Sequence, residues 1–159
     1  MEDSLQQEFP ELSVVAAAIS GDTTSGGRSR LPQLLEEYSP DVVVIGLGGN
    51  DALRGTPLSV IGTNLEAMAS AARTAGARVV VAGMQIPPNY GPAYTSRFRA
   101  LYPEVANNTG SGLIPFLLEG VATVEGMMQD DGIHPTAAAQ PVVAELVTRA
   151  VTEQLRAAE

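Results

Sequence analysis

Residues 41–51 read Asp-Val-Val-Val-Ile-Gly-Leu-Gly-Gly-Asn-Asp, an apolar run followed at once by glycines and polar side chains. A continuous apolar run, rather than an alternating one, is typical of a strand buried on both faces of a parallel sheet. Three further runs have the same character, and the last of them is the weakest. We therefore predict four parallel strands, over residues 12–19, 41–47, 77–84 and 112–117.

The segments between these runs carry apolar residues at helical spacing. Leu31, Leu34, Leu35 and Tyr38 form one such stripe. Thr56 and Pro57 are a plausible N-cap and first helical residue, opening a helix that reaches Ala72. Two more helices are predicted over 94–105 and 141–155. The alternation predicts a single α/β domain over residues 1–159, with helices on both faces of the sheet.

The composition excludes several classes of function. Hydrophobic residues make up 45% of the 159 residues, enough for one sizeable core. The net charge is −9 and all 9 basic residues are Arg, so we predict neither nucleic-acid binding nor attraction to an anionic membrane. No apolar run approaches the ~20 residues of a membrane span. The acidic, polar first ten residues do not resemble a signal peptide.

Glycines and polar side chains gather in four loops, at 20–27, 48–51, 85–92 and 128–135. In open parallel sheets, ligands bind at the carboxyl ends of the strands, where three of these loops begin. Neither glycine cluster matches a dinucleotide or P-loop motif, and the chain has no lysine for a P-loop. We predict no metal ion and no cofactor.

The single histidine, His134, follows Asp131 by three residues in a loop that contains glycine. That spacing lets the carboxylate accept a hydrogen bond from Nδ1, which would leave Nε2 free as a general base. The Asn50 amide and the Gly21 backbone N–H could converge on the same space, as in an acyl-transfer site. A purely structural histidine remains an alternative. Asp22 and Asp51 could be helix caps, and capping is the favoured interpretation for Asp22.

Four blocks make the chain similar to a known family: Ile-Ser-Gly-Asp-Thr (19–23), Gly-Leu-Gly-Gly-Asn-Asp (46–51), Ile-Pro-Pro-Asn-Tyr-Gly (86–91) and Met-Gln-Asp-Asp-Gly-Ile-His-Pro (128–135). They resemble signature blocks of the SGNH (GDSL) hydrolases, in particular the bacterial arylesterases and acyl-CoA thioesterases/lysophospholipases. The resemblance covers nearly the whole chain in the right order. It implies a flavodoxin-like α/β/α sandwich with a parallel sheet.

The resemblance also implies roles for individual residues. Gly21 and Asn50 would form the oxyanion hole, Asp131 would orient the base, and His134 would be that base. The loops after residues 51 and 85 would border the acyl groove, through Leu53, Arg54, Gly55, Ile86, Pro87, Asn89 and Tyr90.

This chain departs from the family's pattern in one block. The family begins with a central strand that ends in Gly-Asp-Ser-Leu and carries the nucleophilic serine, and this chain lacks that strand. Glu2-Asp3-Ser4-Leu5 resembles a remnant of the motif, so Ser4 is a candidate nucleophile, although no strand precedes it. Its alternative role is a helix cap or a frayed terminus. Ser20 and Ser25 are weaker candidates.

The sequence thus predicts a serine esterase or thioesterase that hydrolyses carboxylic esters through an acyl-enzyme. Its substrates would be short to medium acyl or aryl esters, thioesters or lysophospholipids. The alternative is a truncated, inactive form of this fold that binds acyl ligands or oligomerises. Because the sheet would lack a central strand, we also predict a two-fold homodimer whose contact includes residues 1–20.

Overall fold

Three parallel strands form the sheet in the part of the chain that the structure describes. The structure is a computed structural model that describes residues 1–157, apart from the side chain of Ser4. The strands β1 (Val42–Ile45), β2 (Arg78–Ala82) and β3 (Gly112–Ile114) lie in the order β1-β2-β3. Val43 pairs with Val79, and Val81 pairs with Leu113. This arrangement confirms the predicted parallel sheet.

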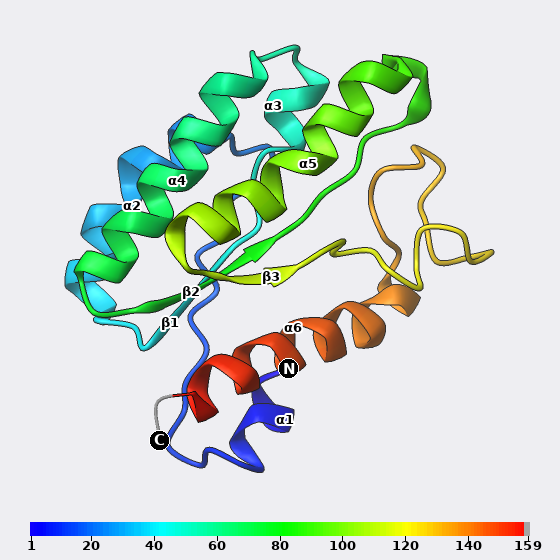
Figure 1. Ribbon diagram of the computed structural model, residues 1–159. Helices are drawn as coiled ribbons and strands as arrows, with labels where there is room; N and C mark the ends of the chain where they lie inside the picture. Colours follow the sequence, from blue (N-terminus) through cyan, green and yellow to red (C-terminus); the bar gives the residue numbers. More distant parts are fainter. Residues whose placement is uncertain (158–159) are drawn as a thin grey trace.

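Helices cover both faces of this sheet (Figure 1). The helices α2 (Thr24–Tyr38), α4 (Leu58–Thr74) and α5 (Pro92–Thr109) pack together on one face, and α6 (Gln140–Arg156) covers the other. The remaining helices are short: α1 (Glu2–Gln6), α3 (Gly49–Leu53), η1 (Pro88–Tyr90) and η2 (Ala137–Ala139). The three-layer α/β/α fold is as predicted.

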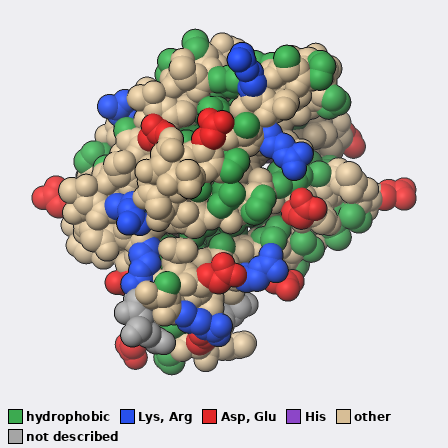
Figure 2. All heavy atoms as spheres, in the orientation of Figure 1, with side chains coloured by type: hydrophobic (Ala, Val, Ile, Leu, Met, Phe, Trp, Pro, Cys, Tyr) green, Lys and Arg blue, Asp and Glu red, His purple; other side chains and the backbone are tan. Residues whose placement is uncertain are grey.

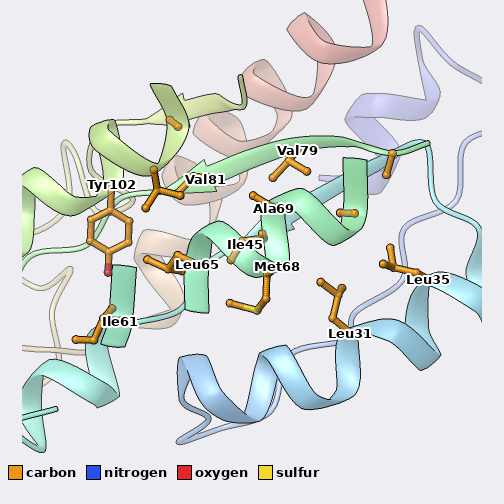
Figure 3. Packing of buried hydrophobic residues seen from close by; sticks show 14 of the residues in the cluster. Leu31, Leu35, Ile45, Ile61, Leu65, Met68, Ala69, Val79, Val81 and Tyr102 are labelled. Atoms are coloured by element: carbon orange, nitrogen blue, oxygen red, sulfur yellow. The ribbon is translucent and has the colours of Figure 1, made fainter. Parts of the chain in front are cut away.

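The surroundings of β2 on both faces of the sheet explain why its sequence is continuously apolar. Val79 and Val81 are fully buried on the face that packs against α4 and α5, where Leu65 and Tyr102 lie (Figure 3). Val80 is fully buried on the opposite face, in a cluster that includes Val147 of α6. Each residue of the run therefore enters one of two cores.

The strand predicted over 12–19 does not form, and this prediction is wrong. The segment has no regular secondary structure, and two of its side chains, Val15 and Ile19, are 47% and 59% exposed. Side chains bond its backbone instead: Val14 N–H donates to Glu2 Oε1, and Ala17 O accepts from Arg30 Nη1. A strand needs a neighbour for its backbone groups, and no described strand lies in register with this segment.

The predicted helices form, but their boundaries agree with the sequence only in part: α2 begins at Thr24, ahead of the stripe that starts at Leu31, and α5 runs on to Thr109. The helix predicted over 141–155 is α6, within a residue at each end. The predicted cap at Thr56 is wrong, because α4 begins at Leu58 and its N-cap is Pro57, which has no side chain to accept a bond. Thr56 N–H donates instead to the Asp51 carbonyl at 2.9 Å, closing the turn after α3.

On the face shown in Figure 2, Arg side chains lie scattered among Asp and Glu, and hydrophobic side chains gather along its middle. No helix within residues 1–157 combines the length and hydropathy needed to cross a membrane.

Candidate active site

The Gly21 loop follows the extended 12–19 segment and turns sharply into α2. Gly21 has a φ of +75°, in the left-handed region that glycine adopts without strain. The N-cap of α2 is Thr23, whose hydroxyl accepts from Gly26 N–H at 3.2 Å. The predicted cap role of Asp22 is therefore wrong. Its carboxylate accepts from Thr23 N–H at 2.8 Å and forms an ion pair with Arg30 at 2.9 Å.

The Asn50 loop begins where β1 ends and leads directly into α3. Gly48 turns the chain with a φ of +114°, and a Cβ at this position would lie 2.6 Å from the Tyr102 hydroxyl oxygen. That hydroxyl donates to the Leu47 carbonyl at 3.1 Å, and burial raises the pKa of Tyr102, so it remains a donor. Only glycine fits here, and the loop is thereby held against α5.

Hydrogen bonds join the Gly21 and Asn50 loops. Asn50 Nδ2 donates to the Asp22 carbonyl at 3.0 Å, and Arg54 Nη2 donates to the Gly21 carbonyl at 3.1 Å. The amide nitrogen of Asn50 carries two N–H groups, so one is left for another acceptor. The structure thus brings together the two residues that the sequence predicts as oxyanion donors.

A buried network beneath these loops fixes their relative position. Asp51 is 2% exposed and accepts from Thr24 N–H at 2.8 Å and from the Thr24 hydroxyl at 2.6 Å. Asn64 donates to that hydroxyl at 3.1 Å and accepts from Arg28 Nη1 at 3.1 Å. Asp51 therefore places a negative charge at the first turn of α2, where the helix dipole favours it. The sequence suggested Asp51 as a helix cap. The helix whose N-terminus it stabilises is α2, which precedes Asp51 in the chain.

The aspartate and the histidine meet as the sequence predicts. His134 Nδ1 lies 2.7 Å from Asp131 Oδ2, and Asp131 Oδ1 accepts the backbone N–H groups of Ile133 and His134 at 2.9 and 3.0 Å. These bonds, led by those from His134, lower the pKa of Asp131 to about 2. The side chains are 66% and 43% exposed, so Nε2 of His134 faces open space.

This loop holds its own shape. Met128 and Pro135 form an isolated antiparallel bridge, and Gln129 N–H donates to the His134 carbonyl at 2.8 Å. The hydrogen bonds of His134 to described residues all stay within 129–134. Both this loop and the joined loops lie toward the end of the sheet where the strands terminate (Figure 1).

The predicted groove residues occupy two separate segments. Leu53 ends α3 and is partly buried, whereas Arg54 and Gly55 are exposed. Ile86 packs against the main core, and Asn89 and Tyr90 are exposed on η1. The Tyr94 hydroxyl lies 3.4 Å from the carbonyls of Ala52 and Thr56, and so links α5 to the first of these segments.

No hydrogen bond joins a described serine side chain to His134. Ser4 belongs to α1, which packs at the C-terminal end of α6, where Glu8 and Arg156 form an ion pair at 2.6 Å (Figure 1). His134 precedes the other end of that 17-residue helix, about 25 Å away along its axis. The side chain of Ser4 lies outside the described residues. Ser20 is exposed beside Gly21, and Ser25 is exposed on the first turn of α2.

A base held by a carboxylate, at the same edge of a sheet as paired N–H donors, is the chemistry of hydrolases that cleave esters through a serine. The model of the GDSL-like lipase/acylhydrolase family matches residues 1–141. The chain belongs to this family, and with it to the carboxylic ester hydrolases of the GDSL type.

Several relatives cover most of the chain. Esterase TesA of Pseudomonas aeruginosa is 51% identical over 92% of this chain and 73% of its own length. An arylesterase of Vibrio mimicus is 44% identical over 96% of this chain and 76% of its own. Thioesterase 1/protease 1/lysophospholipase L1 of Escherichia coli is 40% identical over 86% and 66%. A crystal structure of TesA superposes with a TM-score of 0.89 at 48% identity, covering 96% of this chain and 87% of that one.

Proposed function

We propose that this protein hydrolyses carboxylic esters and thioesters through an acyl-enzyme, with His134 as the general base. The observation that carries the proposal is the 2.7 Å contact between Asp131 Oδ2 and His134 Nδ1. Because the pKa of Asp131 is about 2, its carboxylate is ionised at neutral pH and holds the proton on Nδ1. Nε2 then accepts the proton of the attacking serine hydroxyl and later delivers it to the leaving alcohol or thiol.

The oxyanion of the tetrahedral intermediate would be bound by Gly21 N–H and the Asn50 amide. The shared hydrogen bonds of the two loops support this pairing, since they hold both donors in place before substrate arrives. A site built in this way loses little energy to rearrangement during the reaction.

The substrate class follows from the relatives, whose names include an arylesterase and a thioesterase/lysophospholipase. We assign the acyl groove to the two segments described above, Leu53-Arg54-Gly55 and Ile86-Pro87 with Asn89 and Tyr90. Leu53→Phe and Ile86→Phe should then lower the relative rate on longer p-nitrophenyl esters by about tenfold. Val60→Phe, at an exposed position of α4, is the matched control. The same chain-length profile in all three variants would contradict the groove assignment.

The nucleophile is tested by covalent labelling with a fluorophosphonate, followed by intact mass and identification of the labelled peptide. A label on residue 4 that Ser4→Ala removes would establish Ser4. Turnover of p-nitrophenyl acetate with no labelled serine would contradict the acyl-enzyme mechanism. The absence of both turnover and labelling would favour the alternative of an acyl-ligand-binding protein.

The homodimer stays a prediction. The exposure of Val15 and Ile19 supports a contact in residues 1–20, because apolar side chains there remain uncovered. Light scattering over a dilution series, with and without residues 1–10, tests it; a monomer at every concentration would make the prediction wrong.

A further inference from the structure

Asp131 is followed by a glycine, and no other aspartate in residues 1–159 has this neighbour. The backbone nitrogen that follows an aspartate can attack the side-chain carboxyl carbon and close a five-membered succinimide ring. A side chain on that next residue hinders the attack, and glycine has none. Residues 1–159 also contain no Asn-Gly pair, which reacts in the same way. The pair Asp131-Gly132 is therefore the position at which this reaction meets the least hindrance.

The hydrogen bonds of Asp131 turn its carboxylate toward the chain that follows. Oδ1 accepts from the N–H groups of Ile133 and His134 at 2.9 and 3.0 Å. The Gly132 nitrogen lies in the chain between Asp131 and these two donors, so the carboxyl group is folded back over it. Two groups that are held together in one orientation react faster than groups that must first find each other.

The surroundings of the pair are open to water. The Asp131 side chain is 43% exposed, and a Cβ placed on Gly132 would meet no atom within 4 Å. Water, which must hydrolyse the ring, can therefore reach it. The attack must break the bond from Gly132 N–H to the Gln129 carbonyl, which is 2.9 Å long. The hydrogen bonds of the pair to described residues all stay within 129–134, so only local contacts oppose the rearrangement.

The other aspartates lack this combination of features. Asp51 is 2% exposed and is followed by an alanine. Asp22 is held in the ion pair with Arg30, and the residue after it is a β-branched threonine. Asp3 is exposed and is followed by a serine, whose side chain is small. Asp3 therefore serves as the internal reference for the reaction at Asp131.

The contact with His134 opposes the reaction. Nδ1 holds Asp131 Oδ2 at 2.7 Å, and this bond must break before the oxygen can leave. The bonds from His134 and Ile133 also lower the pKa of Asp131 to about 2, so the carboxyl group is ionised at neutral pH. An ionised carboxylate is attacked more slowly than a neutral carboxylic acid. Removal of the imidazole should therefore accelerate ring closure.

We propose that Asp131-Gly132 is a modification site, at which Asp131 of the folded chain converts to isoaspartate, and that the contact with His134 restrains the conversion. This proposal does not depend on the proposed ester hydrolysis.

The conversion needs no reactant other than water. The Gly132 nitrogen bonds to Cγ of Asp131 and loses its proton. One carboxyl oxygen leaves as water, with that proton and one from the solvent. Water then adds to the backbone carbonyl carbon of residue 131, and the bond from this carbon to the Gly132 nitrogen breaks. The new carboxylic acid returns a proton to the solvent, and the chain now runs through Cβ and Cγ.

The product no longer orients the histidine. In isoaspartate the free carboxylate is attached directly to Cα, so it is one bond shorter than the aspartate side chain, and the backbone is one bond longer. The contact with His134 Nδ1 and the two N–H bonds to Oδ1 depend on the original lengths. Under the proposed function, the modified chain would therefore lose its activity.

The test incubates the full chain at neutral pH and body temperature and measures isoaspartate at each aspartate. Peptides are quantified by fragmentation in the mass spectrometer, and an isoaspartate-specific methyltransferase gives an independent readout. Residue 131 should contain about fivefold more isoaspartate than residue 3, because only Asp131 precedes a glycine. Circular dichroism checks that the chain stays folded. A yield at residue 131 equal to or below that at residue 3 would overturn the proposal.

Two variants separate the roles of the glycine and the histidine. Gly132→Ala should lower the yield at residue 131 by about fivefold, because its methyl group hinders the attack. His134→Ala should raise the yield by about threefold, because the carboxyl group is released and protonates more readily. The yield at Asp3 should be the same in both variants and is the control. An unchanged or lower yield in His134→Ala would overturn the restraint. If Gly132→Ala does not fold, the comparison of residues 131 and 3 in the original chain still decides the site.

Turnover separates this proposal from the proposed function. Loss of p-nitrophenyl acetate hydrolysis in proportion to the isoaspartate content at residue 131 would support both. Isoaspartate at residue 131 with full turnover would support the modification site and contradict the role of Asp131 in orienting His134. Loss of turnover in a folded chain with no isoaspartate at residue 131 would overturn the modification site and leave the catalytic assignment intact.

Discussion

The two halves of the site are built differently. The Gly21 and Asn50 loops rest on a buried network, in which Asp51 is 2% exposed and bonds to Thr24. The Asp131–His134 loop carries the same type of carboxylate at 43% exposure and bonds only within itself among the described residues. One half depends on the core for its shape, and the other is made by four neighbouring residues. Mutations in the buried network beneath the first half should cost stability, and mutations in the second half should cost only activity.

The largest effect is expected at the base. His134→Ala should lower kcat for p-nitrophenyl acetate by about 10⁴-fold or more, because the chain has no other imidazole to accept the proton. Its melting temperature should be unchanged, since the side chain is 66% exposed. Retained turnover would make the Asp-His assignment wrong.

A smaller effect is expected at the oxyanion donor. Asn50→Ala should lower kcat by about 10²–10³-fold, in line with the loss of one donor elsewhere. KM should change little, because the donor acts on charge that develops in the transition state. A variant with normal kcat and a lower melting temperature would instead make Asn50 a residue that only braces the Asp22 carbonyl.

The contrast between the two carboxylates is tested by matched variants. Asp51→Asn places an amide N–H against donors of Thr24 and should lower the free energy of unfolding by about 2 kcal/mol. Asp131→Asn, at the exposed site, should change the free energy of unfolding far less than Asp51→Asn does. Chemical denaturation of both variants measures the difference. Equal losses would show that the two halves are supported alike.

The smallest effect concerns pH. Since the pKa of Asp131 falls from its ordinary value of 3.8 to about 2, the loop contacts are fully present above pH 4 and disappear as the pH falls through 2. An NMR titration of the Asp131 carboxyl carbon should give its midpoint near 2, and Asn substitution of the residue removes the signal. A midpoint near 4 would mean that the bonds from Ile133 and His134 do not hold in solution.

The sequence predicts these regions unequally, for a physical reason. The apolar runs of β1, β2 and residues 12–19 look alike in the sequence, but of these three only β1 and β2 pair with a neighbouring strand. The pattern within one segment does not show whether a neighbouring strand is available. The Asp131–His134 contact is local, so spacing alone predicts it. Thr24 and Asp51 are 27 positions apart, and their bond becomes visible only when α2 and α3 are placed. The only indication of this bond in the sequence is that each of the two glycine-rich loops contains a polar residue, Thr24 in one and Asp51 in the other.

The loops at the carboxyl edge of the sheet share one feature that governs how the protein can be attached to a support. Residues 1–159 contain no lysine, so these loops offer no side-chain amine to an amine-reactive resin. Coupling through such a resin would therefore leave the exposed Asp131 and His134 side chains unmodified.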